Sequence, residues 1–251
     1  MELNLLPLFP VALGRIQLQP DPLDAALQLQ TILALRGSAT SNPDPGCAWT
    51  GDLQGVWQLH RHPDFAGLMA TIRSAVWRYL QHLGFEPSQL ALLVQRCWPV
   101  VSAVDQVIGR HHHPNAHLSV VYYLNGDGSG RSGCLRFWPQ QPPNELVPGL
   151  SGGHQGPQAP GTAGDTSALP HPWAAPWHDV APQAGLLLIF PAGLDHAVLP
   201  NDDDDDLRVS IALDLCLCAR AATDPQQQPE YLAPHPSHWQ AWDPADTDIL
   251  P

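Results

Sequence analysis

The chain has 251 residues, of which 24 are acidic and 11 basic, so its formal net charge at pH 7 is -13. A surface of this sign repels phosphate backbones and anionic lipids, and we therefore expect neither a nucleic acid nor a membrane as partner. Hydrophobic residues make up 44% of the chain, and 28 prolines with 20 glycines indicate many turns, which argues against a helical bundle.

Two helices are predicted before residue 88. The first spans residues 20–37, where Asp21 can cap the first turn and Gly37 suits the stop. The second lies within residues 62–85, where apolar residues recur at steps of three and four. We expect residues 1–88 to be a helical buttress of the same domain as the remainder of the chain.

Short strands dominate after Pro87, most of them bounded by Gly or Pro. The segments that read as strands are residues 90–98, 100–109, 117–125, 133–139, 185–191, 195–200 and 207–218. Several short strands after two helices predict a mainly β fold of the α+β class, a barrel or a sandwich. We expect residues 89–218 to form this core, with a Gly/Pro-rich insertion at 139–178 and a Pro/Asp-rich tail at 219–251.

The cysteines and the N-terminal residues indicate in which cellular compartment the protein is expected. Five cysteines occur, none in a CxxC pair, and they read as small buried hydrophobes in a reducing compartment. The N-terminal residues lack the basic region and cleavage site of a secretory signal. No apolar run reaches the roughly 18 residues of a membrane span. We therefore expect a soluble, cytoplasmic protein.

The segment GRHHHPNAHLSVVYYLN, residues 109–125, places three histidines before a strand. Alternation along the strand puts His111 and His113 on one side, and such a pair can bind one ion. Imidazole suits iron, zinc, copper and nickel. His196, delivered by a buried apolar strand, is the best candidate for a third ligand. The alternative is a solvated loop in which the histidines bind nothing.

Two strands carry one polar and one apolar face. Ser119 and Tyr123 share the polar face of the strand after the histidines, and Arg208, Ser210 and Asp214 share that of the strand at 207–218. An arginine on such a face requires an anion, and a bound dicarboxylate would serve. A structural ion pair is the simpler alternative.

Taken in order, these segments resemble the iron(II)- and 2-oxoglutarate-dependent oxygenases. The resemblance is closest to a bacterial branch with the motifs H-x-H-P-N-x-x-L-S-x-V-Y-Y and G-x-L-x-x-F-P-x-x-L-x-H-x-V-x-P, and it covers residues 98–217. It implies a double-stranded β-helix, a jelly-roll or cupin-like barrel. The implied reaction is of the hydroxylase type: oxidative decarboxylation of 2-oxoglutarate to succinate, coupled through O2 to C–H hydroxylation.

The resemblance also implies site residues. His111 and His196 would hold iron(II). A second set would bind the distal carboxylate of 2-oxoglutarate, namely Arg208, Tyr123, Ser119 and Ser210.

The metal motif departs from the wider superfamily, in which a carboxylate follows the first histidine as H-x-D. His113 stands at that position, so three imidazoles would leave the iron site one negative charge short of the usual set. Either His113 is the third ligand, or Asp105 or Asp195 supplies a carboxylate instead. In addition, Asp214 stands where the family commonly has asparagine.

Two other classes stay open on the sequence alone. A cupin-like three-histidine metalloprotein, acting as a 2-oxoglutarate-independent dioxygenase or a metal-dependent sensor, would share the ligands but have no use for Arg208 and Tyr123. A binding module with a structural metal would prefer four ligands that include cysteines. The substrate, a small molecule or a protein side chain, and the oligomeric state are not indicated by the sequence.

Overall fold

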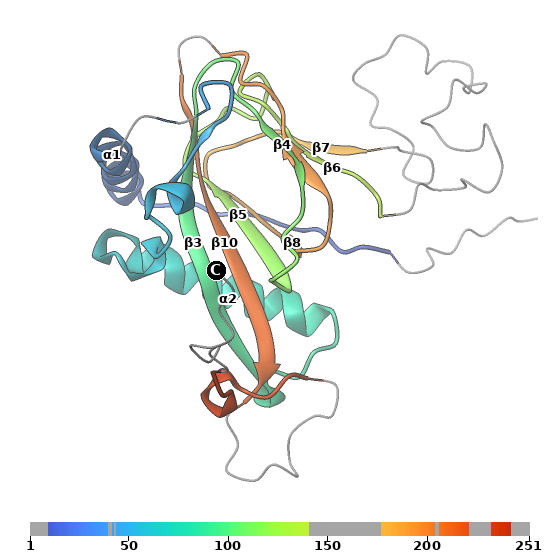
Figure 1. Ribbon diagram of the computed structural model, residues 1–251. Coiled ribbons are helices and arrows are strands. Elements are labelled where there is room, and N and C mark those ends of the chain that lie inside the picture. The colour runs from blue at the N-terminus through green and yellow to red at the C-terminus, as the bar shows by residue number, and fades with distance from the viewer. Residues whose placement is uncertain are drawn as a thin grey trace, which may run out of the picture.

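Two antiparallel sheets carry the fold (Figure 1). The computed structural model describes residues 10–39, 42, 44–140, 177–203, 206–220 and 232–241. The larger sheet has the order β1-β8-β5-β10-β3-β2, with β1 at Gly14–Gln17, β8 at Leu186–Pro191, β5 at Leu118–Tyr123, β10 at Arg208–Ala219, β3 at Leu90–Ser102 and β2 at Trp49–Thr50. The smaller sheet has the order β4-β9-β6-β7, with β4 at Ile108–His111, β9 at His196–Val198, β6 at Leu135–Phe137 and β7 at His178–Val180.

Helices α1 (Pro22–Ser38) and α2 (Ala66–His82) confirm the two predicted helices. The Asp21 side chain caps α1 by accepting from the Leu23 N–H at 2.8 Å. The predicted stop at Gly37 is wrong, because α1 continues to Ser38 and its C-cap is Ala39 in an extended conformation. A glycine inside a helix costs only about 1 kcal/mol relative to alanine, so the helix passes through it.

The helices pack on the larger sheet and contribute part of the main hydrophobic core. The apolar face of α2 is buried, and its residues join those of one face of the larger sheet in a single cluster. From β5 this cluster takes Leu118, Val120 and Tyr122, whereas Ser119 and Tyr123 point to the opposite face. The predicted division of these strands into an apolar and a polar face is therefore confirmed.

The strand boundaries differ from expectation at one place. We predicted separate strands at 90–98 and 100–109, but β3 runs unbroken to Ser102, and only Ile108–His111 forms the next strand. The turn between them places Asp105 at a φ of 62° and is fixed by its N–H donating to the Asn201 carbonyl at 2.8 Å. Strands β1, β2 and β7 have two to four residues, too few for a periodic pattern to predict.

The expected division into buttress, core and tail stays a prediction. Most of the Gly/Pro-rich insertion, residues 141–176, lies outside the described residues. Among the helices that are described, none has the length and apolar character needed to cross a membrane.

Candidate metal centre and its cavity

A cavity of about 580 Å³ lies between the two sheets. The larger sheet contributes the polar faces of β5 and β10, and the smaller sheet contributes the ends of β4 and β9. All the site residues indicated by the sequence line this one cavity, namely His111, His113, Ser119, Tyr123, His196, Arg208 and Ser210. Residues separated by almost one hundred positions in the chain therefore share one site.

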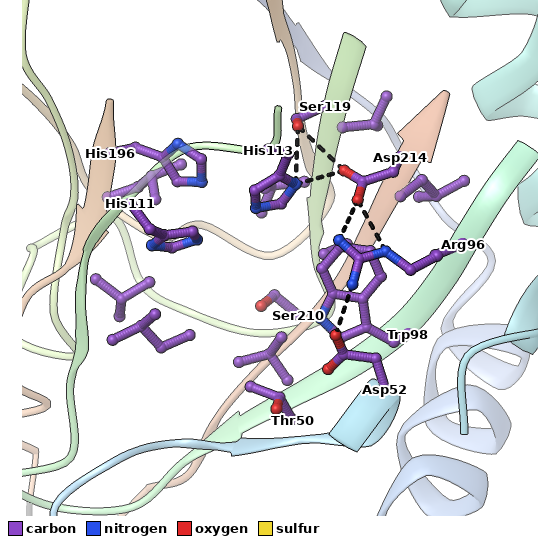
Figure 2. Close-up of a pocket in the computed structure, with 18 of the residues that line it drawn as sticks. Thr50, Asp52, Arg96, Trp98, His111, His113, Ser119, His196, Ser210 and Asp214 are labelled. Carbon is purple, nitrogen blue, oxygen red and sulfur yellow. Dashed lines mark hydrogen bonds and ion pairs between the residues drawn. The ribbon is translucent and has the colours of Figure 1, made fainter. Parts of the chain in front are cut away.

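Three histidine rings meet at one wall of the cavity (Figure 2). His111 ends β4 and His196 begins β9, and the antiparallel register pairs them directly. His113 is held nearby by its backbone N–H, which donates to the Ala192 carbonyl at 2.9 Å. One ring nitrogen from each histidine lies within 4.8 Å of the other two. This is the arrangement from which three imidazoles bind one cation.

Each ring is oriented through its Nδ1 atom. The Nδ1 atoms of His111 and His196 lie 2.7 Å and 2.8 Å from the carbonyl oxygens of Gly109 and Leu194. The Nδ1 of His113 lies 2.5 Å from Asp214 Oδ1. Because carbonyls and carboxylates only accept, each Nδ1 carries the proton and each Nε2 keeps a lone pair for a metal.

Burial favours the neutral form of two of the rings. Desolvation lowers the pKa of His196 to about 4 and also lowers the pKa of His111. A metal requires the neutral form of imidazole, so these shifts suit the role of ligand at neutral pH. The donor set therefore fits a divalent transition metal such as iron(II).

A carboxylate network stands behind His113 (Figure 2). Asp214 is fully buried, and its Oδ2 accepts from Arg96 Nε at 3.0 Å and from Arg96 Nη2 at 2.5 Å. Arg96 Nη1 donates to Asp52 at 3.0 Å, on the 3-10 turn Gly51–Gln54. Desolvation alone would raise the pKa of Asp214, but the hydrogen bonds and charges of His113 and Arg96 outweigh it and hold that pKa below its usual value.

The guanidinium of Arg208 is buried among neutral partners. It is 2% exposed, and it donates to the Gly133 carbonyl at 3.0 Å and to the Ser102 hydroxyl. Its Nε has no partner, and no carboxylate of a described residue forms an ion pair with it. A buried cation without an anion is costly, so Arg208 makes this wall of the cavity a candidate anion site.

Tyr123 and Ser210 lie beside this anion site. They are paired between β5 and β10, and both are almost fully buried. Burial raises the pKa of Tyr123 to about 12, so its hydroxyl keeps its proton and can donate it to an anion. Ser119 is placed differently, because its hydroxyl is 3.3 Å from Asp214 Oδ1 and 3.2 Å from His113 Nδ1. Its expected contact with the cosubstrate stays a prediction.

The two alternative carboxylates do not join the histidine cluster. Asp195 is bound by Arg110 at 2.6 Å and by His112 at 3.1 Å. Asp105 is exposed on the turn after β3 and does not line the cavity. Of the three candidates for the third ligand, only His113 therefore belongs to the group that can hold a metal.

Sequence reasoning missed Arg96 and Asp52. Arg96 stacks on the Trp98 ring, with its Cζ 4.6 Å from the ring centroid, so three neighbours fix its position. The available signal was a charged residue within the apolar strand at 90–98, together with Asp214 in another apolar strand. Two opposite charges in strands that pair with each other predict an ion pair.

Gly133 supports the anion site and yields a stability prediction. Its φ is +86°, and a Cβ atom there would lie 2.2 Å from the Leu199 carbonyl oxygen. We expect Gly133→Ala to lower the free energy of unfolding by about 3 kcal/mol, from the left-handed conformation and the backbone collision together. The measurement is urea unfolding of the metal-free chain.

Gly55→Ala is the matched control for this substitution. Gly55 has a φ of +79°, but a Cβ atom there would meet nothing within 4 Å. We expect it to cost about 1 kcal/mol, from the conformation alone. Equal losses for the two variants would show that the close approach of Gly133 to the backbone at Leu199 has no energetic weight.

Comparison with known proteins gives a match to one family model over part of the chain, and a fold. Residues 96–214 match a family model described as "Putative 2OG-Fe(II) oxygenase". No curated protein sequence matches the chain significantly. Among solved structures, a prolyl-4-hydroxylase from Pseudomonas putida is similar at a TM-score of 0.51 and 16% identity, over 82% of this chain and 92% of that one.

Two further structures share the fold. The non-heme α-ketoglutarate-dependent carbocyclase SnoK from nogalamycin biosynthesis has a TM-score of 0.55 at 13% identity, over 85% of this chain and 84% of its own. HygX from Streptomyces hygroscopicus, with nickel and 2-oxoglutarate bound, has a TM-score of 0.50 at 13% identity, over 82% of this chain and 83% of its own. The expected double-stranded β-helix is thereby confirmed.

Proposed function

We propose that the chain is a 2-oxoglutarate- and iron(II)-dependent oxygenase, as the match of residues 96–214 to that family model supports, and that it hydroxylates a C–H bond of its substrate. In such a reaction 2-oxoglutarate, O2 and the substrate give succinate, carbon dioxide and the hydroxylated product. Structures of similar fold include an α-ketoglutarate-dependent carbocyclase and an α-ketoglutarate-dependent epimerase, whose reactions are not hydroxylations. Hydroxylation is therefore a narrower proposal than the oxygenase class, and it needs its own test.

One observation carries the oxygenase reading of this cavity. The same 580 Å³ space contains the three-imidazole group and the buried Arg208 that has no anionic partner among the described residues. A dicarboxylate cosubstrate that binds a metal at one end requires a cation at its other end. A cupin-like metalloprotein without 2-oxoglutarate would leave Arg208 uncompensated, and we find no observation that favours it.

The residues of the chain have separable tasks in this proposal. His111, His113 and His196 would hold iron(II), which when bound supplies the redox chemistry that activates O2 as 2-oxoglutarate is decarboxylated. Arg208 would bind the distal carboxylate, and the neutral hydroxyl of Tyr123 would donate a hydrogen bond to it. These contacts fix one end of the cosubstrate and so determine which end faces the histidines.

The cavity wall beside His196 is apolar. Leu135, Phe190 and Val198 line it beside His196, and the ring of Phe190 packs edge-on against the imidazole at a centroid distance of 5.1 Å. An apolar surround strengthens the ion pair with Arg208, because charges attract more strongly where water is absent. We propose a small molecule or a protein side chain as substrate, since the charge of -13 disfavours nucleic acid.

The test is turnover of the cosubstrate by the purified chain. With iron(II), ascorbate and oxygen, we expect 2-oxoglutarate to be converted to succinate, slowly without substrate and faster with it. Under anaerobic conditions, addition of 2-oxoglutarate to the iron-loaded chain is expected to produce a metal-to-ligand absorption band. A chain that binds iron(II) but gives neither the band nor succinate would contradict the proposal.

A further inference from the structure

A continuous chain of charged groups leads away from His113. Asp214 accepts from the ring of His113 on Oδ1 and from Arg96 on Oδ2, and Arg96 in turn donates to Asp52. Asp214 is 0% exposed, and the side chain of Asp52 is 15% exposed. With two carboxylates and one guanidinium, this group carries one net negative charge directly behind a ring of the histidine cluster.

We propose that Asp214 is a positioning residue that makes His113 a metal ligand and supplies from behind it the negative charge that a ligating carboxylate would otherwise provide. This inference rests on the metal site of the proposed function. In metal sites a carboxylate that accepts from a ligating imidazole fixes its tautomer and orientation and raises its basicity. The negative charge that the three-imidazole set lacks would thus be present on Asp214, which contacts the ligand His113 instead of the metal.

The hydrogen bonds around Asp214 require a carboxylate. Four N–H or O–H donors converge on its two oxygens: the ring of His113, the hydroxyl of Ser119 and two guanidinium N–H groups of Arg96. An asparagine at this position would offer one oxygen and one NH2 group. Its NH2 group would then oppose either His113 Nδ1 or the Arg96 guanidinium, both of which are donors. Only the acid satisfies both neighbours at once.

The test compares metal affinity in Asp214→Asn with that in the wild-type chain. The readout is the dissociation constant for cobalt(II), obtained anaerobically from its visible absorption, so no turnover is required. We expect the affinity to fall by about 10- to 100-fold. We also expect the midpoint potential of the iron-loaded variant to become more positive, because the reduced ion tolerates the loss of a nearby negative charge better than the oxidised ion.

Asp195→Asn is the matched control. Asp195 also accepts from a histidine and an arginine, His112 and Arg110, but neither of these belongs to the three-histidine group. We expect its cobalt(II) affinity to stay within threefold of wild type. An Asp214→Asn affinity within threefold of wild type, or an equal loss in both variants, would overturn the inference.

Arg96→Gln distinguishes the effect of the negative charge on Asp214 from the effect of its ion pair with Arg96. This variant also serves as the test if Asp214→Asn does not fold. It removes the cation that neutralises Asp214 and leaves the bond between Asp214 and His113. We expect unchanged or tighter cobalt(II) binding despite a lower melting temperature. A loss of more than tenfold would overturn the inference, because Asp214 would then act only through its ion pair.

The same experiments distinguish this inference from the proposed function. A wild-type chain that binds cobalt(II), loses affinity in Asp214→Asn and yet makes no succinate would contradict the oxygenase proposal and support the inference. A chain that makes succinate equally well and binds cobalt(II) equally well with Asn at position 214 would support the oxygenase proposal and overturn the inference. Failure of the wild-type chain to bind cobalt(II) would overturn both.

Discussion

Replacing Arg208 with alanine is expected to raise the dissociation constant for 2-oxoglutarate by about 30-fold or more and to reduce succinate formation to background. The guanidinium is 2% exposed and has no anionic partner among the described residues, so the cosubstrate carboxylate would be its counter-ion. Loss of one member of a buried, hydrogen-bonded charge pair costs about 2 to 5 kcal/mol, and 1.4 kcal/mol corresponds to tenfold. Anaerobic titration of 2-oxoglutarate into the iron-loaded chain measures the effect.

The control for this prediction must separate lost binding from lost folding. Arg78→Ala removes an exposed arginine from α2, on a helix that does not line the cavity. It should leave 2-oxoglutarate affinity unchanged. In Arg208→Ala itself, cobalt(II) affinity should stay near that of wild type, because no metal-binding imidazole contacts Arg208 through a hydrogen bond in the structure. Undiminished 2-oxoglutarate affinity in a folded Arg208→Ala chain would refute the assigned role.

The second large effect is expected at the histidine cluster. His196→Ala should weaken iron(II) or cobalt(II) binding by roughly a thousandfold, since one of three ligands is worth about 4 kcal/mol of a structural-site affinity of 10 to 16 kcal/mol. His111→Ala and His113→Ala should do the same. The measurements are metal content after anaerobic loading and desalting, and the dissociation constant for cobalt(II).

His112 provides the internal control for the three substitutions. It lies between two of the proposed ligands, is exposed, and its Nδ1 faces Asp195 at 3.1 Å. His112→Ala should therefore keep the metal affinity of wild type. If it weakened metal binding as much as His113→Ala, alternation along the chain would not have identified the ligands correctly.

The alternation of polar and apolar residues predicted more of the candidate site residues than of the strands that form the fold. His111 and His113 share a side because they are two positions apart. Arg208 stands with Ser210 and Asp214 on the polar face of a strand whose other face is aliphatic. The buried apolar strand that precedes His196 makes this residue the best candidate for a third ligand, and the resemblance to a family implies the same role. The structure places all of these residues on one cavity. Short-range periodicity is enough here because each ligand lies on or next to a strand.

What the sequence did not reveal depends on tertiary pairing. Asp52, Arg96 and Asp214 lie on a turn and two different strands, and nothing local shows that they meet. Strands β1 and β7 are too short to show alternation, and they form because neighbouring strands offer free backbone groups. The predicted helix end at Gly37 was wrong because the energetic cost of a glycine in a helix is small compared with the stabilisation from packing of the whole helix.

The direct pairing of His111 with His196 has a mechanical meaning. These residues begin or end two strands of the smaller sheet, and the register between the strands is irregular from Ile108 to His111. A cation shared by the two rings would act as a cross-link that closes a loop of more than eighty residues, as a disulfide does. It would also stiffen the pairing of β4 with β9 at the place where the register is irregular. The protein would then gain rigidity and catalytic competence in the same event.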